Sequence, residues 1–293
     1  MSEERSIPAS RSISQVIGEA AALLTEAGVA QPRREAASLL GFVLEEDRAY
    51  LVLNANVLLS EVQQCRYEEV VRRRAKREPF HYITGVKEFF GIDFVVTPDV
   101  LIPRPETELL VERALELIRP DAPEQTVCDV GTGSGCIVIT LLHDRSQLHG
   151  VGLDISRPSL VVAAQNALAQ RVNTRLDLRE SDCFSALAAD ERFTLITANP
   201  PYITEEDHRG IQPEVRDFEP RLALTPGGDG LAIVRRIIAD APAFLHPGGH
   251  LLMEIGYDQA DAVREMIDPT IWSSSEILPD LQGIPRCVVL RHI

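Results

Sequence analysis

The sequence contains few cysteines, and none of them forms a recognisable pair. The five cysteines (Cys65, Cys128, Cys136, Cys183 and Cys287) are scattered, without a C-x-x-C spacing and without a histidine-rich partner segment. This distribution argues against a zinc site and against a disulfide framework. We therefore expect reduced thiols, no bound metal and a reducing compartment.

Long apolar runs and an excess of positive charge are also missing. No stretch reaches the roughly 18 apolar residues needed to span a bilayer, and the opening residues MSEERSIPAS lack the apolar segment of a signal peptide. We expect a soluble, cytoplasmic protein that does not contact membranes. Lys and Arg number 29 against 44 Asp and Glu, which gives a net charge of −15. A surface of this sign is repelled by phosphate backbones, so no stable nucleic-acid binding is expected.

One basic run, residues 72–77 with the sequence RRRAKR, departs from this average. Cations at the end of a helix complement the helix dipole, so the favoured interpretation is the solvated last turn of a helix. The alternative is a local binding patch.

The chain of 293 residues suffices for one large domain and a small one. Residues 1–78 predict a helical bundle, because apolar residues recur at helical spacing in short segments. This part contains no constellation that could do chemistry, so by elimination it serves recognition or support. Two β-type runs around Gly85 and Gly91 predict a β-hairpin linker over residues 79–101. Residues 102–293 form the remaining domain, which carries every candidate site.

Strands and helices alternate in this last domain from about residue 125. The expected strands are 126–130, 150–153, 175–178, 193–198, 250–255 and 287–291, and the expected helices are 136–143, 158–169, 231–244 and 259–266. The alternation predicts an α/β fold with a doubly wound, mainly parallel, Rossmann-like sheet. Ligands in such sheets bind beyond the carboxyl ends of the strands.

A glycine-rich loop follows the first of these strands and opens a helix. It reads Gly131, Thr132, Gly133, Ser134 and Gly135. Glycines permit the tight turn, and the helix N-terminus offers free N–H groups. The spacing is neither G-x-G-x-x-G nor a P-loop, and no lysine follows that would neutralise phosphate. A cofactor without phosphate therefore fits better, although a plain strand-to-helix turn would also explain the glycines.

Two acids that follow later strands complete the candidate cofactor site. Asp154 ends the next expected strand, where a carboxylate accepts hydrogen bonds from both hydroxyls of a ribose. Asp182 lies beyond the third strand, where a carboxylate can accept from an adenine amino group. Asp154 alone could equally be a helix N-cap or a surface carboxylate. The loop and the ribose acid, in strand–turn–helix context, favour an adenosine-type cofactor.

The segment Asn199, Pro200, Pro201 and Tyr202 follows the fourth strand. A planar –NH2 group could be held between the Asn199 side-chain carbonyl and the Pro200 backbone carbonyl, while the prolines restrict the backbone and Tyr202 packs against the acceptor. Such a clamp suits in-line transfer of a sulfonium methyl group, helped by positioning and electrostatics. The simpler interpretation is a strand ended by prolines, with Asn199 as a turn former.

Together these motifs resemble the methyltransferases that modify exocyclic base nitrogens or glutamine amides. The flanking segments YITG and EFFG (82–91), LIPRPETE (101–108) and GGDGL (227–231) resemble the peptide chain release factor N5-glutamine methyltransferases. This resemblance covers nearly the whole chain. It implies methylation of the glutamine in the Gly-Gly-Gln loop of release factors, with S-adenosyl-L-methionine as cofactor and the helical bundle as the part that docks the release factor.

The resemblance also implies roles for individual residues. The glycine loop 131–135 and Asp154 would bind the cofactor, Asp182 and Cys183 would lie at its adenine, and Asn199 would border both cofactor and glutamine. Pro200, Pro201 and Tyr202 would hold the glutamine. The family often has an aromatic residue where this sequence has Cys183, and a thiol stacks less well on adenine. Either Phe184 compensates or the affinity for the cofactor is lower.

Two other functional classes fit part of the pattern. A DNA or RNA base N-methyltransferase would use the same clamp, but it would need a basic groove and usually a way to extrude the base. A non-catalytic cofactor-binding partner subunit would have no need for the clamp. We therefore expect a protein-methylating enzyme.

Overall fold

The computed structural model describes residues 11–119 and 125–293. The chain forms two compact units. The first contains the chain up to Gly85 together with Pro213–Phe218, and the second contains Val86–Gln212 and Glu219–Ile293. The expected linker 79–101 is thus divided between the units, and a short segment of the expected domain 102–293 belongs with the helical unit.

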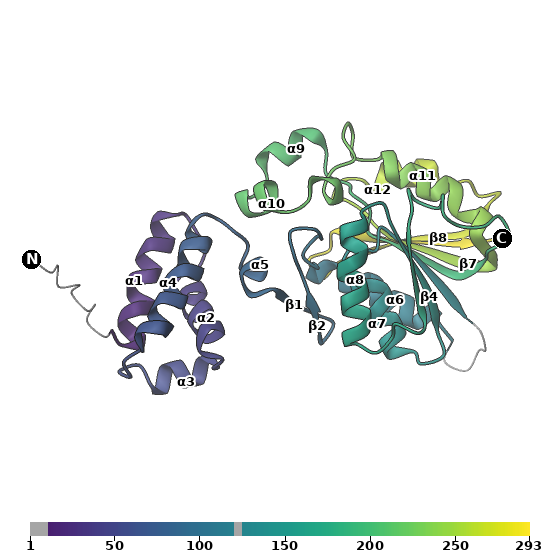
Figure 1. Ribbon diagram of the computed structural model, residues 1–293. Coiled ribbons are helices and arrows are strands. Elements are labelled where there is room, and N and C mark those ends of the chain that lie inside the picture. The colour runs from purple at the N-terminus through teal and green to yellow at the C-terminus, as the bar shows by residue number, and fades with distance from the viewer. Residues whose placement is uncertain (1–10, 120–124) are drawn as a thin grey trace, which may run out of the picture. The chain divides into compact units, whose positions relative to one another are not determined.

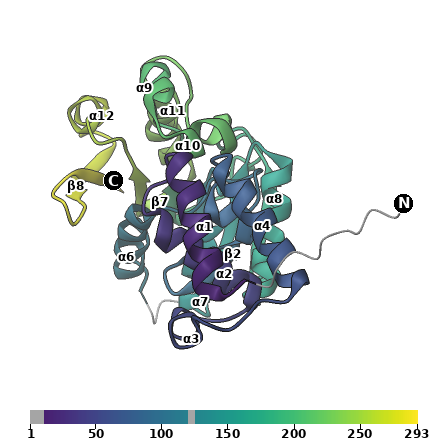
Figure 2. The same ribbon diagram turned by 90° about the vertical axis from the view of Figure 1, so that its left-hand side faces the viewer.

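The first unit is helical, as the spacing of apolar residues predicted. Its helices are α1 (Ile13–Glu26), α2 (Pro32–Leu44), α3 (Arg48–Leu53), α4 (Glu61–Ala75), α5 (Phe80–Thr84) and α10 (Pro213–Phe218). Helices α1, α2 and α4 lie side by side (Figures 1 and 2). Leu24, Leu39 and Leu40 are fully buried between them. Ser12 and Ser60 begin α1 and α4 with capping boxes, which satisfy N–H groups that a helix start leaves open.

The expectation of β structure before Gly85 was wrong. Residues 80–84 form the short helix α5, which starts after Pro79 and ends at Gly85 with φ +77°. Proline suits the start of a helix, and glycine suits the left-handed conformation that ends one, so local backbone chemistry outweighs the β-type composition. The hairpin itself is β1 (Val86–Phe89) paired antiparallel with β2 (Ile92–Val95).

The basic run 72–77 is not a uniformly solvated helix end. Arg72 pairs with Glu69 at the surface, but Arg74 is only 4% exposed. The guanidinium of Arg74 pairs with Glu35 on α2 and lies 2.9 Å from Glu214 on α10. The run therefore contributes charge-paired packing within the helical unit, in addition to complementing the end of α4.

The second unit is built on a seven-stranded sheet of order β5-β4-β3-β6-β7-β9-β8. The strands are β3 (Thr126–Val130), β4 (His149–Asp154), β5 (Leu176–Glu180), β6 (Phe193–Ala198), β7 (Leu245–Glu254), β8 (Trp272–Pro279) and β9 (Pro285–His292). Strands β5, β4, β3, β6 and β7 run parallel, and β9 pairs antiparallel with both β7 and β8. The predicted doubly wound, mainly parallel sheet is confirmed.

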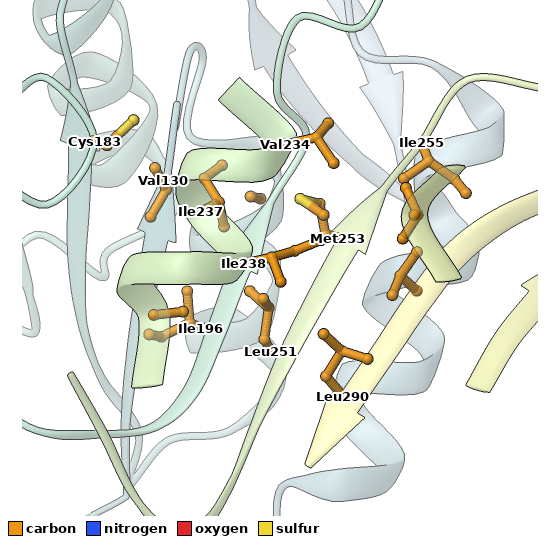
Figure 3. Packing of buried hydrophobic residues seen from close by; sticks show 14 of the residues in the cluster. Val130, Cys183, Ile196, Val234, Ile237, Ile238, Leu251, Met253, Ile255 and Leu290 are labelled. Carbon is orange, nitrogen blue, oxygen red and sulfur yellow. The ribbon is translucent and has the colours of Figure 1, made fainter. Parts of the chain in front are cut away.

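Helices cover both faces of this sheet (Figure 1). They are α6 (Glu108–Leu117), α7 (Cys136–Asp144), α8 (Arg157–Ala169), α11 (Ala232–Asp240) and α12 (Ala260–Met266). Alternate side chains of each strand face opposite layers: Val127 and Leu195 pack with α6 and α7, whereas Ile196 and Met253 pack under α11. Figure 3 shows Ile237 and Ile238 of α11 lying over the strands that carry Ile196 and Met253.

Three elements of this unit were not expected from the sequence. Strand β8 reads WSSSEILP and is mostly exposed, so it lacks the apolar run of a buried strand. After β6, the chain also forms α9 (Glu205–Gly210) and a single 3-10 turn, Arg221–Ala223. Among the described residues, no helix combines the length and apolar character needed to cross a membrane.

Replacing Arg74 with alanine should destabilise the helical unit by about 3 kcal/mol, because the variant leaves the acids on α2 and α10 without their buried partner. Hydrogen exchange of the α2 and α4 amides measures this loss directly. Arg72→Ala is the matched control on the same helix; its pair is exposed and should contribute less than about 0.5 kcal/mol. Equal effects of the two substitutions would contradict a structural role for Arg74.

Candidate active site

The register of the parallel strands places three predicted site residues and one further acid at the carboxyl ends of neighbouring strands. Val130 of β3 pairs with Leu153 of β4 and with Ala198 of β6, and Ala198 pairs with Met253 of β7. The residue that follows each partner lies one step further toward the carboxyl ends. These residues are Gly131, Asp154, Asn199 and Glu254.

The glycine loop turns sharply between β3 and α7. Gly131, Gly133 and Gly135 have φ values of +74°, +56° and +81°, a region that residues with a Cβ seldom adopt. The N–H groups of Gly131 and Thr132 both donate to the carbonyl of Leu153, which fastens the loop to β4. A Cβ at Gly131 or Gly133 would touch no protein atom, so both positions leave the backbone open to a ligand.

A buried acid forms hydrogen bonds that hold the glycine loop. Asp129 is fully buried and accepts hydrogen bonds from the hydroxyls of Thr132, at 2.7 Å, and Thr197, at 2.8 Å. Burial raises the pKa of Asp129 to about 6. The carboxyl group thus ties the glycine loop to the strand β6 that leads into Asn199.

Asp154 is positioned by backbone N–H groups on both sides. Its Oδ2 accepts from Gly133 and its Oδ1 from Ser156, each at 2.8 Å. The side chain is 9% exposed, and burial raises its pKa. A carboxylate oxygen has capacity for more than one hydrogen bond, so both oxygens can still accept from vicinal hydroxyls.

Asp182 and Cys183 border the same space. Arg236 of α11 donates to Asp182 Oδ1 at 2.6 Å, and Cys183 adopts φ +48° with 8% exposure. Burial raises the pKa of the Cys183 thiol. Phe184, which could compensate for the missing aromatic residue at the adenine, is not among the residues that line the cavity described below. Phe184 is 4% exposed and stacks on Phe244, with ring centroids 5.2 Å apart.

A cavity of about 360 Å³ joins these groups within the second unit. It is lined by the loop residues 131–134, by Asp154, Asp182 and Cys183, and by Asn199, Pro200 and Pro201. Gly135 and Tyr202 do not line it. The predicted cofactor loop and the first three residues of the clamp therefore face one common space.

Asn199 is held by a compact polar network. Its Nδ2 donates to Thr107 Oγ1 at 3.1 Å and to Glu254 Oε2 at 3.0 Å. Thr107 donates in turn to Glu254 Oε2 at 2.6 Å, and the hydroxyl of Tyr202 donates to Glu254 Oε1 at 3.0 Å. Burial raises the pKa of Glu254 and is the largest factor raising that of Tyr202.

The backbone after the prolines is fixed as well. Gln259 donates to the carbonyl of Tyr202 at 3.0 Å, and Gln259 Oε1 accepts from the N–H of Gly256 at 2.9 Å. A Cβ at Gly230 would lie 2.3 Å from the Tyr202 carbonyl oxygen. The glycine-rich segment 227–230 therefore lies against the clamp. This contact explains why glycine is needed at a point of the chain that is distant in sequence from the clamp.

Another buried acid anchors a segment that lines the cavity. Glu219 accepts from Arg104 at 2.6 Å and from the N–H of Ile102 at 3.1 Å. Burial raises the pKa of Glu219. Arg104 lines the cavity, so this ion pair anchors the segment 101–104 beside the site.

The sequence reasoning did not single out Thr107, Glu254 or Gln259. A signal for Glu254 was present: it is a lone acid at the end of the apolar run LLMEI, on a strand expected to lie in the same sheet as Asn199. Thr107 lies in the segment LIPRPETE that carries the family resemblance, but its contact with Asn199 could not be predicted because the two residues are 92 apart in sequence. Gln259 gave no signal, since the Tyr202 carbonyl that it binds lies 57 residues away. Among the residues that the structure describes, no group of three His, Cys, Asp or Glu side chains is arranged to hold a metal ion.

Both family models and full-length relatives match this chain. The PrmC N-terminal domain model matches residues 15–85, and the methyltransferase small domain model matches residues 105–216. A release factor glutamine methyltransferase of Koribacter versatilis is 43% identical over 95% of this chain and 98% of the relative. Another, of Cereibacter sphaeroides, is 45% identical over 92% of this chain and 94% of the relative.

A solved structure shares the fold at low sequence identity. The hMettl16 catalytic domain, in complex with MAT2A 3′UTR hairpin 6, has a TM-score of 0.57 and 15% identity. The similarity covers 84% of this chain and 92% of that chain.

The parallel sheet, the open glycine loop and the carboxylate at the end of β4 define an S-adenosylmethionine-dependent methyltransferase. Within this class, the two relatives named above share more than 40% identity with this chain over more than nine-tenths of its length, which decides the family. The chain belongs to the release factor glutamine methyltransferases.

Replacing Asp154 with alanine should weaken binding of S-adenosylmethionine by at least about tenfold, because the variant removes a carboxylate that can accept from two hydroxyls. Isothermal calorimetry measures this change. Asp177→Ala, an exposed acid on the neighbouring strand β5, is the control and should leave the affinity unchanged. An unaltered affinity in the Asp154 variant would show that this carboxylate does not hold the cofactor.

Proposed function

We propose that this enzyme transfers a methyl group to the side-chain amide nitrogen (N5) of the glutamine in the Gly-Gly-Gln motif of peptide chain release factors. The names of its relatives support this substrate. The observation on which the proposal chiefly rests is the orientation of Asn199. The side-chain NH2 is occupied by Thr107 and Glu254, while the residue itself lines the cavity that contains the glycine loop.

The cofactor is bound by the residues around the loop. The backbone of Gly131, Thr132, Gly133, Ser134 and Gly135 forms the turn that receives it. Asp154 would accept hydrogen bonds from its ribose hydroxyls, and Asp182 and Cys183 would border its adenine. Bound S-adenosylmethionine supplies a sulfonium methyl group as the electrophile.

The substrate amide is held by the clamp. Its two N–H groups donate to Asn199 Oδ1 and to the backbone carbonyl of Pro200, which fixes the plane of the amide. Pro201 restricts the backbone that carries these acceptors, and Tyr202 packs at the end of the clamp. A substrate nitrogen fixed in this way would lose its freedom of movement on binding, before the reaction, and this positioning would lower the barrier by several kcal/mol.

No side chain is needed as a general base. The amide nitrogen becomes acidic as it acquires the methyl group and releases its proton to water. Glu254, the acid that Asn199 contacts, has both oxygens engaged by Thr107, Asn199 and Tyr202. We therefore assign the rate enhancement to positioning and electrostatics.

The helical unit recognises the release factor, and nucleic acid is not a stable partner. The net charge of −15 supports the second point. Most of the basic run is engaged with acids, since Arg72, Arg73, Arg74 and Arg77 all form ion pairs. We place the enzyme in the cytoplasm, where translation factors reside.

Transfer of tritium from labelled S-adenosylmethionine to purified substrates tests the function. Label should appear in a release factor and disappear when the glutamine of its Gly-Gly-Gln motif is replaced by glutamate. Transfer RNA, ribosomal RNA and DNA are offered in parallel. Labelling of a nucleic acid, with none in the release factor, would instead support a base N-methyltransferase.

Asn199→Ala should lower kcat by about a hundredfold, because it removes one preorganised acceptor at the reacting amide. Calorimetry should show cofactor affinity within about threefold of wild type, since Asp154 and the loop are untouched. Asn173→Ala, at an exposed position, is the control for the same chemical change. Wild-type turnover in the Asn199 variant would rule out the clamp.

A further inference from the structure

Glu254 is the most enclosed acid in contact with the clamp. It ends β7, its residue is 2% exposed, and none of the described cations forms an ion pair with it. Burying a carboxyl group without a cation is costly unless hydrogen bonds compensate. Glu254 receives three such bonds, from Thr107, Asn199 and Tyr202.

The geometry of these bonds leaves Asn199 with one favourable amide orientation. Thr107 Oγ1 accepts from Asn199 and uses its own hydrogen toward Glu254. Glu254 Oε2 therefore meets two donors and acts as an acceptor. If the Asn199 amide were turned over, its carbonyl oxygen would face this acceptor, and both N–H bonds would be lost.

The outward-facing atom of Asn199 follows from this constraint. Nδ2 faces the two acceptors Thr107 Oγ1 and Glu254 Oε2, and no described group donates to Oδ1. A clamp for a substrate –NH2 group needs a hydrogen-bond acceptor at this position. If the Asn199 amide were turned over, its own NH2 group would face the NH2 group of the substrate. Such a contact would repel the substrate instead of holding it.

We propose that Glu254 is the positioning residue of the clamp: it fixes the amide orientation of Asn199 so that Oδ1 faces the substrate, and it tethers the hydroxyl of Tyr202. This inference rests on the proposed function, because the substrate amide defines which orientation is productive. Glu254 itself touches neither the substrate nor the transferred methyl group.

The arrangement does not depend on the ionisation of Glu254. A proton on the carboxyl group would sit on Oε1, where the oxygen of Tyr202 can accept it. Oε2 would still accept from Thr107 and Asn199. An uncharged glutamine can therefore take over the role, with its carbonyl oxygen at the position of Oε2 and its NH2 toward Tyr202.

Kinetics of four variants test the assignment, with tritium transfer as the assay. Glu254→Leu keeps the approximate volume but removes both acceptors, and kcat should fall by at least about tenfold, as expected for misplacing a preorganised group. Glu254→Gln should stay within about threefold of wild type. Added to Asn199→Ala, the leucine substitution should lower kcat by less than about a further threefold, because Glu254 acts mainly through Asn199. Tyr202→Phe measures the contribution of the tether alone.

A readout that needs no turnover accompanies the kinetics. In wild type and in Glu254→Gln, the side-chain NH2 protons of Asn199 should be protected from exchange in NMR spectra, with the assignment made by their loss in Asn199→Ala. In Glu254→Leu this protection should fall at least about tenfold. Calorimetry of cofactor binding confirms that each variant remains folded and retains its loop.

Several results would overturn the proposal. Wild-type kcat in Glu254→Leu, or unprotected Asn199 protons in wild type, would show that the orientation is not fixed by Glu254. Loss of activity in Glu254→Gln with Asn199 still protected would indicate a role for the charge instead. If wild type labels no release factor, the proposed function fails, and the exchange measurement still decides whether Glu254 orients Asn199.

Discussion

The parallel register of β4, β3, β6 and β7 is the constraint on which the site depends. Because Val130 pairs with both Leu153 and Ala198, the residues that follow these strands arrive at one level of the sheet edge. Backbone pairing thus places the glycine loop, Asp154 and Asn199, the residues proposed to bind cofactor and substrate, at the same level of the sheet. A shift of one residue would also turn every core side chain to the wrong face, so hydrophobic packing fixes the position of the site.

Hydrogen bonds to buried acids then fix the positions of the residues that the register aligns. Asp129 connects the glycine loop to β6, Asp154 connects the loop to the start of α8, and Glu254 connects the clamp to Thr107. In each case N–H or O–H donors, rather than cations, compensate for burial. Directional bonds hold orientation better than a point charge does, which suits the proposed mechanism of catalysis by positioning.

The sequence predicted the parts of this design that are local. Glycines at 131, 133 and 135 are needed where φ is positive, and an apolar run before them indicates a buried strand, so the loop and its strand were found from neighbouring residues. The network around Asn199 was missed because Thr107 and Glu254 lie 92 and 55 residues away. Strand β8 was missed because an exposed edge strand needs little apolar character, and α5 because its two ends decide its conformation.

The prolines of the clamp do not fix its geometry alone; residues distant in sequence are needed as well. Pro200 and Pro201 restrict φ at their own positions, but they leave the direction of the Tyr202 carbonyl open. Gln259 fixes that direction by binding the Tyr202 carbonyl, and Gly230 allows the close approach because any Cβ there would collide with it. The clamp is thus held on one side through Asn199 and on the other through the Tyr202 backbone. In the proposed function, rigidity at both ends would let a neutral acceptor discriminate an –NH2 group from a hydroxyl or a methyl group, because a site that does not adjust leaves a mismatched group unpaired.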